Sequence, residues 1–227
     1  IIGGFNLVLD GDVPIGAGLS SSAAVECAAV FAINELFELG IDKMEMVKIA
    51  QKAEHTFSGV MCGIMDMFAS MYGKNGHVIK LDCRSLEYEY KPFKLDGYKI
   101  VLLNTNLKHA LAESAYNKRR QECEQGVAWV KEHHTEINSL RDISIAMLQQ
   151  HVLDKDQVVY KRCLYVVEEI QRLIEACTDL ENGNIRALGK KMFATHEGLS
   201  KLYEVSCKEL DYLVDAVKDN EDVLGAR

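Results

Sequence analysis

The sequence predicts an α+β protein with two lobes, and three observations lead to that prediction. Up to about residue 107, segments typical of strands alternate with segments typical of helices, whereas beyond it only long amphipathic helices are indicated. The composition, 48% apolar and 26% charged with 2 prolines, is typical of a chain that buries a core. We therefore expect a mixed α/β lobe at residues 1–107 and a mainly helical lobe at residues 108–227.

The elements of the first lobe begin with a strand. A β-rich segment that alternates apolar and polar residues precedes Gly11, which predicts a strand at 5–10. Residues 20–39 contain no helix breaker and are so apolar that we expect a buried helix ending at Gly40. The remaining predicted elements are helices at 42–57 and 63–72 and strands at 77–83, 86–93 and 98–106, the first two of these strands forming an antiparallel pair.

The second lobe is predicted to be helical throughout. Apolar residues recur along it at helical spacing, and the pair Asn182-Gly183 separates two of the helices. The predicted helices cover 112–134, 143–150, 155–180, 185–203 and 206–218.

Charge and cysteine content narrow the functional classes. The formal net charge of −8 argues against duplex DNA or an anionic membrane as the main partner. No apolar run approaches the roughly 18 residues of a membrane span. The seven cysteines lack the C-x-x-C spacing of a zinc site or a redox dithiol. We expect a cytoplasmic protein with reduced thiols and small-molecule partners, and the oligomeric state stays open.

A loop rich in glycine and serine joins the first predicted strand to the first helix. Gly16 and Gly18 let the backbone turn tightly and approach a ligand, and the helix N-terminus offers N–H groups to an anion. The hydroxyl groups of Ser20, Ser21 and Ser22 could add hydrogen bonds or ligate Mg²⁺. The loop has no P-loop lysine. The pattern favours a phosphate site, although a serine N-cap after a glycine turn uses the same residues.

Two acidic residues lie in apolar surroundings. Glu54 falls beside the apolar stripe of the second predicted helix, so it is either a boundary glutamate whose head reaches water or a ligand of Mg²⁺. Asp66 is the only charged residue between His55 and Lys74. It is either a first-turn aspartate favoured by the helix dipole or a group that activates a hydroxyl for attack on a phosphoryl group.

A tyrosine and a short basic run open the second lobe. Tyr116 precedes Lys118-Arg119-Arg120 in a predicted helix. These residues indicate either a solvated basic face or a tyrosine hydroxyl that covers a sugar.

Residues 16–24 resemble the central phosphate-binding motif of the GHMP small-molecule kinases. Further segments resemble the galactokinase family within this superfamily, in the same order along the chain, and together they cover nearly all of it. These segments are Ala53–Phe57, Cys62–Phe68, Leu81–Leu86, Arg119–Cys123, Tyr203–Cys207 and Glu209–Asp211.

The resemblance implies a two-lobed GHMP kinase fold that transfers a phosphoryl group from ATP to the C1 hydroxyl of α-D-galactose with the help of Mg²⁺. Residues 1–107 and 108–227 would belong to its N-terminal ATP-binding domain and its C-terminal domain. Ser22 and Glu54 would hold Mg²⁺, Asp66 would be the catalytic residue, and Gly63, Asp66 and Tyr116 would contact the sugar. The implied ATP-binding residues are Gly16, Ala17, Gly18, Leu19, Ser20, Ser21 and Ser22.

Two alternatives stay open, a related sugar kinase for N-acetylgalactosamine or another hexose, and a catalytically silent sensor that binds galactose and ATP. The family's N-terminal motif and its glycine-rich third motif have no counterpart in the chain. We therefore expect a fragment, incomplete at both termini, with little or no kinase activity of its own. Such a fragment would expose strand edges and self-associate.

Overall fold

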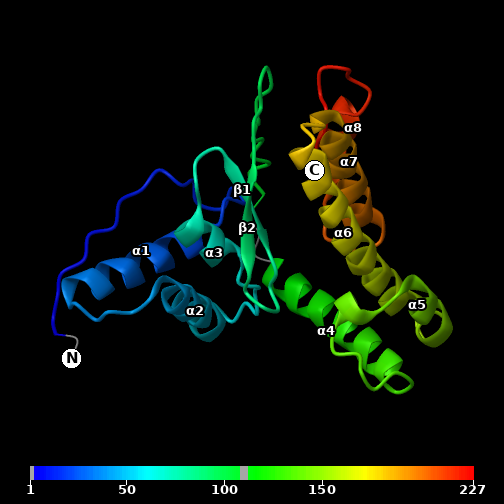
Figure 1. Ribbon diagram of the computed structural model, residues 1–227, viewed down its shortest axis with the longest axis horizontal. Helices are drawn as coiled ribbons and strands as arrows, with labels where there is room; N and C mark the ends of the chain where they lie inside the picture. The colour runs from blue at the N-terminus through cyan, green and yellow to red at the C-terminus, as the bar shows by residue number, and fades with distance from the viewer. Residues whose placement is uncertain (1–2, 108–111) are drawn as a thin grey trace. The chain divides into compact units, whose positions relative to one another are not determined.

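The computed structural model describes residues 3–107 and 112–227, with side chains from Tyr116 onward in the second range (Figure 1). The chain divides into two compact units, Ile1–Tyr116 and Asn117–Arg227, and each is described by itself. Helices dominate and a small sheet accompanies them, so the predicted mixture of helix and strand is confirmed. The predicted boundary between residues 107 and 108 adjoins residues 108–111, which lie outside the described ranges, and the division into kinase domains remains a prediction.

Helices build the core of the first unit. They are α1 (Ser21–Leu36), α2 (Lys43–Ala53) and α3 (Met65–Tyr72), and a π-helical turn, η1 (Glu54–Ser58), continues α2. Asp42 caps α2, because its side chain accepts a hydrogen bond from the Glu45 backbone N–H at 3.0 Å. The buried side chains of the cluster that joins these helices are Ala23, Cys27, Val47, Ala50, Ile64, Met67 and Phe68.

An antiparallel hairpin packs against α3. Its strands are β1 (His77–Leu81) and β2 (Tyr88–Pro92), with Leu81 opposite Tyr88, which confirms the predicted pair. The rings of Phe68 and Tyr88 meet edge to face with centroids 5.1 Å apart. The Tyr90 hydroxyl donates a hydrogen bond to the Tyr72 carbonyl at 2.7 Å. The hairpin therefore holds α3, and with it the segment that carries Asp66.

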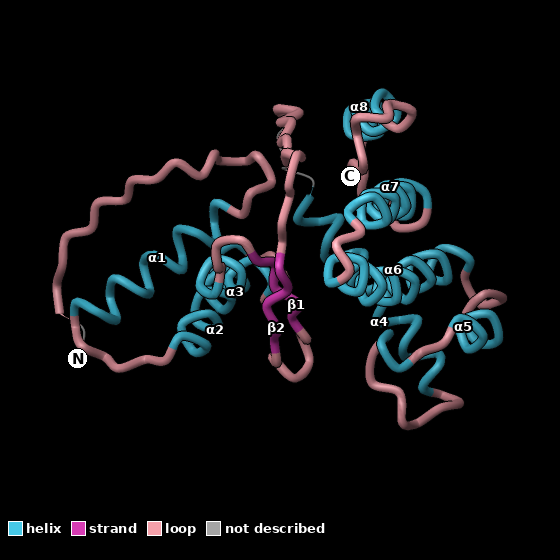
Figure 2. Tube along the Cα trace, turned by 45° about the horizontal axis from the view of Figure 1, so that its top comes forward, coloured by secondary structure: helices cyan, strands magenta, loops and turns pink. Residues whose placement is uncertain are grey.

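Two segments predicted as strands, 5–10 and 98–106, have no partner strand. Both run as loops, drawn in pink in Figure 2, and the described sheet contains only β1 and β2. Their apolar side chains are open to solvent, with Val8 91% and Val101 73% exposed. Apolar alternation supplies the side chains of a strand, but a strand also needs a neighbour for its backbone hydrogen bonds. The strand prediction is therefore wrong for both segments.

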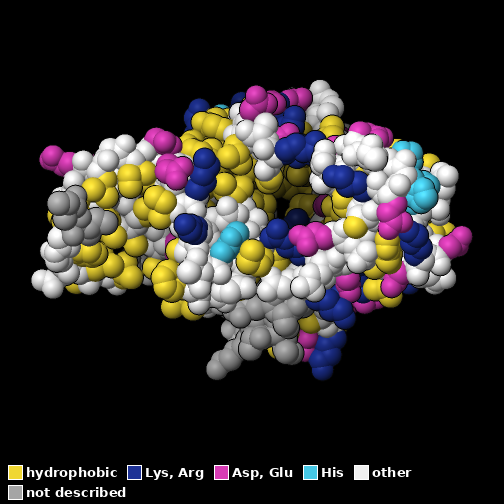
Figure 3. Space-filling model, turned by 90° about the horizontal axis from the view of Figure 1, so that it is seen from below, with side chains coloured by type: hydrophobic (Ala, Val, Ile, Leu, Met, Phe, Trp, Pro, Cys, Tyr) yellow, Lys and Arg dark blue, Asp and Glu magenta, His cyan; other side chains and the backbone are white. Residues whose placement is uncertain are grey.

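The expectation that the first helix is buried is also wrong. Only Ala23, Cys27 and Asn34 of α1 are buried, whereas Phe31 is 47% and Leu36 is 61% exposed. The helix packs one face against α2 and α3 and leaves its other faces open. Figure 3 shows apolar side chains, in yellow, spread over the surface on the left, where the first unit lies.

The second unit is helical as far as the structure describes it, as predicted, with helix ends shifted by a few residues. Its elements are α4 (Ala112–Lys131), the 3₁₀ turn η2 (Leu140–Asp142), α5 (Ile145–His151), α6 (Gln157–Glu181), α7 (Ile185–Lys201) and α8 (Lys208–Val217). The core side chains are Val130, Ile137, Leu140, Ile143, Leu148, Val152, Val159 and Cys163. None of the helices in the described ranges is long and apolar enough to cross a membrane.

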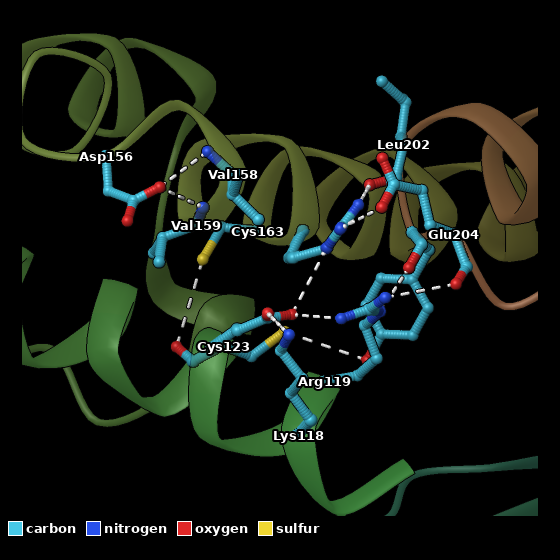
Figure 4. A network of polar contacts seen from close by, with 12 residues as sticks. Lys118, Arg119, Cys123, Asp156, Val158, Val159, Cys163, Leu202 and Glu204 are labelled. Atoms are coloured by element: carbon cyan, nitrogen blue, oxygen red, sulfur yellow. Dashed lines mark hydrogen bonds and ion pairs between the residues drawn. The ribbon is translucent and has the colours of Figure 1, made fainter. Parts of the chain in front are cut away.

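A buried ion network ties α4 and α6 to the chain that follows α7 (Figure 4). The Glu122 carboxylate lies 2.7 Å from the Arg119 guanidinium and 3.3 Å from that of Arg162. Arg119 also donates to the Tyr203 carbonyl, and Arg162 to the Leu202 carbonyl, both at 2.5 Å. Arg119 is buried, so the interpretation of this basic run as a solvated face is wrong for that residue.

Candidate active site

The glycine and serine loop leads directly into the N-terminus of α1. Gly16 and Gly18 adopt positive φ angles of 72° and 74°, a conformation that favours glycine. Ser20 is the N-cap residue but has a left-handed backbone, and its side chain makes no capping hydrogen bond. The first turn also holds no acidic side chain. The exposed N–H groups of this turn are therefore left without a side-chain cap and can bind an anion.

Glu54 is placed by the change from α helix to π helix. It is the first residue of η1, directly after α2. A single π turn inside a helix is often found at functional sites. The turn also departs from the rotation of 100° per residue, so Phe57 does not continue the apolar stripe of α2 and is 88% exposed. Glu54 is the first residue of this turn, so it still follows the rotation of α2 and keeps its predicted position beside the apolar stripe.

Asp66 lies in the first turn of α3, and hydrogen bonds from α2 and η1 hold the preceding loop. The Gln51 side-chain amide donates to the Cys62 carbonyl at 3.1 Å, and His55 Nε2 lies 2.8 Å from the same oxygen. A single carbonyl thus fixes the start of α3 against the segment that carries Glu54. Gly63 lies in this loop, is exposed, and has open space where a Cβ would be.

Carboxylates gather around Cys62. Burial raises the pKa of its thiol, and the charges of Glu54, Asp66 and Glu26 raise it further. The charges of Glu54 and Asp66 thus both reach the Cys62 thiol, and their roles remain a prediction. The structure adds Glu26 of α1, whose pKa is raised to about 8, first by burial and then by the hydrogen bond and the charge of Glu54.

The residues present fit a magnesium ion. The Oε2 atom of Glu54 is buried without a hydrogen-bond partner, and so is that of Glu26. Mg²⁺ prefers oxygen donors and binds through one or two carboxylates together with waters and substrate phosphates. Among the described residues there is no group of three or more His, Cys, Asp or Glu side chains that could hold a metal by itself. The donor set thus suits a cation that is held by carboxylates and completes its coordination with waters or substrate phosphates.

Tyr116 is the predicted site residue that follows the first-unit helices in the sequence. It lies on α4 and is 44% exposed. Its place beside the sugar remains a prediction.

Nearly the whole chain is similar to proteins of known function. Residues 2–74 match the family GHMP kinases N terminal domain. The galactokinase of Thermotoga maritima is 45% identical over 216 residues, which are 95% of this chain and 59% of that protein. The galactokinase of Clostridium acetobutylicum is 41% identical over 225 residues, 99% of this chain and 58% of that protein.

A solved structure matches as well. The crystal structure of Lactococcus lactis galactokinase complexed with galactose aligns with a TM-score of 0.89 and 36% sequence identity, over 96% of this chain and 56% of that one. The chain is thus similar to GHMP kinases over nearly its whole length. It spans about 59% of the length of the curated relatives it matches.

The part that matches the GHMP kinase domain, residues 2–74, contains every predicted site residue except Tyr116. Sequence reasoning missed Glu26, Gln51 and His55. The signal for Glu26 was its place four residues after Ser22, on the same face of α1. Gln51 and His55 act through the backbone of Cys62, and no pattern in the sequence indicates such contacts.

Proposed function

We propose that this chain is part of a galactokinase of the GHMP kinase family, which transfers the γ-phosphoryl group of ATP to the C1 hydroxyl of α-D-galactose and releases ADP. The observation that carries the proposal is the likeness to the galactose complex of the Lactococcus lactis enzyme over 96% of the chain. The galactokinases with 40–46% identity support it. The small-molecule partners are thus galactose and ATP.

The loop and the start of α1 would hold the phosphates of ATP. Backbone N–H groups between Gly16 and Ser22 are free of side-chain caps and carry the positive end of the α1 dipole. The ATP-binding residues would be Gly16, Ala17, Gly18, Leu19, Ser20, Ser21 and Ser22. Ser22 and Glu54 would hold Mg²⁺, which neutralises phosphate charge that develops during transfer.

Asp66 would act on the sugar hydroxyl. A carboxylate at hydrogen-bond distance from the C1 hydroxyl orients it for in-line attack and accepts its proton as the new P–O bond forms. Hydrogen bonds to the Cys62 carbonyl position the start of α3, and so fix where this carboxylate lies. Gly63 offers open space at the same loop, and Tyr116 would complete the sugar contacts.

The proposal also assigns the domains and the compartment. Residues 1–107 would belong to the N-terminal ATP-binding domain and 108–227 to the C-terminal domain. A cytoplasmic location agrees with the cysteines of the described ranges, which are not joined in disulfides.

The test is sugar-dependent release of ADP from the complete reading frame that contains this chain, with galactose, N-acetylgalactosamine and glucose compared side by side. Release with galactose and not with the others is expected. Faster release with N-acetylgalactosamine would assign the related sugar kinase instead. Binding of galactose and MgATP without release under any condition would assign the silent sensor.

A further inference from the structure

Glu26 and Glu54 come from different helices and meet at one point. Glu26 lies on α1 and Glu54 directly after α2, and the influence of Glu54 on the pKa of Glu26 agrees with two carboxyl groups that lie close to each other. Each nevertheless keeps one oxygen, Oε2, that is buried and has no hydrogen-bond partner. Buried polar atoms in folded proteins nearly always have a partner, so two orphaned oxygens in contacting side chains indicate a missing ligand.

Positive charge is what this point lacks. No described lysine or arginine forms an ion pair with Glu26, Glu54 or Asp66, although all three charges reach the Cys62 thiol. A buried carboxylate without a partner is costly, and two side by side more so. A divalent cation supplies the missing charge and also the missing partner for both orphaned oxygens.

Glu26 also lies on the correct face of α1. It follows Ser22 by four residues, which places the two side chains one turn apart on the same face of the helix. Ser22 and Glu54 are the residues to which the proposed function assigns Mg²⁺. Glu26 is therefore on the helix face that carries the Ser22 hydroxyl.

We propose that Glu26 is the second carboxylate of the magnesium site and binds the cation together with Glu54. The inference rests on the proposed kinase function. It differs from a structural role, in which the Glu26 carboxyl would serve only to orient Glu54 and the charge at position 26 would not affect cation affinity.

The test measures binding of Mn²⁺ alone to the 227-residue chain, from the loss of the electron paramagnetic resonance signal of free Mn²⁺. Mn²⁺ accepts the same oxygen donors as Mg²⁺. The variants are Glu26→Gln, Glu26→Asp and Glu54→Gln, and thermal unfolding without metal establishes that each one folds. The matched control is Glu35→Gln, which removes the same charge from an exposed position of α1.

We expect Glu26→Gln to weaken Mn²⁺ binding by a factor of roughly ten or more. Glu26→Asp should bind with intermediate affinity, because it keeps the charge on a shorter side chain, and Glu35→Gln should match the parent chain. If Glu26→Gln binds as the parent does while Glu54→Gln does not, the inference fails and the proposed metal site stands. Equal weakening by Glu35→Gln would also overturn the inference. A parent chain that binds no Mn²⁺, or Glu54→Gln binding at parent affinity, would overturn both.

Discussion

At the scale of single residues, Asp211 of α8 shows how one carboxylate can join several elements. It accepts hydrogen bonds from the Ser206 hydroxyl at 2.8 Å and the Ser200 hydroxyl at 3.0 Å, and it lies 3.0 Å from His196 Nε2. The hydrogen bonds from Ser206, Ser200 and His196 lower the pKa of its carboxyl group. The charged form of Asp211 is thus stabilised by folding.

The lowered pKa predicts an acid-dependent loss of stability. A carboxyl group whose pKa is lower in the folded state stabilises the fold above its unfolded pKa, and this contribution disappears as the pH falls through the folded value. Asp211→Asn should reduce the free energy of unfolding by about 1 kcal/mol at pH 7, because the site is partly exposed. The difference should shrink toward zero as the pH falls through the lowered pKa of Asp211.

Denaturant unfolding at a series of pH values measures this difference. Asp215→Asn on the same helix is the control, because its ion pair with Lys218 is exposed and should contribute little. A pH-independent difference between Asp211→Asn and the parent chain would contradict the account.

At the scale of elements, the Glu122 carboxylate joins α4 to α6. Glu122→Gln should destabilise the chain by about 3 kcal/mol, because it leaves the buried guanidinium groups of Arg119 and Arg162 without their shared counterion. Thermal and denaturant unfolding measure the loss. Glu124→Gln, two residues further along α4, removes only an exposed pair with Arg120 and should cost less than about 1 kcal/mol. Equal effects of the two variants would show that the network does not hold the helices together.

Elements that depend on local signals could be predicted from the sequence. The β1–β2 hairpin and the helices of the second unit follow from turn residues, caps and periodicity, which act over a few residues. Residues 5–10 and 98–106 could not be predicted in this way, because a strand depends on a partner that its own sequence does not specify. The loop, Glu54 and Asp66 carried visible patterns, whereas Glu26 depends on its contact with Glu54 of another helix.

At the scale of the whole molecule, exposed apolar segments are a conspicuous feature. Val8 and the run from Ile100 to Leu103 are all more than half exposed. Extended apolar chain with unpaired backbone groups is a template for association. We predict that the chain forms larger species as its concentration rises, as sedimentation velocity would show.

Charges placed in one of these segments should oppose that association. The double variant Val101→Lys with Leu103→Lys should shift the chain toward the monomer, because both positions belong to the exposed run. Leu173→Lys, at a single exposed position of α6, is the control and should leave the distribution unchanged. A parent chain that is monomeric at every concentration would contradict the prediction.

The role of Asp66 is the central claim, and the most direct measurement follows formation of galactose 1-phosphate by ³¹P NMR in the complete reading frame that contains this chain. The parent should convert galactose and ATP to galactose 1-phosphate and ADP, and Asp66→Asn should lower the rate by roughly 10²–10⁴-fold. Asp96→Asn, the same change at an exposed position, should keep the parent rate. An Asp66→Asn variant that works at the parent rate would contradict the account.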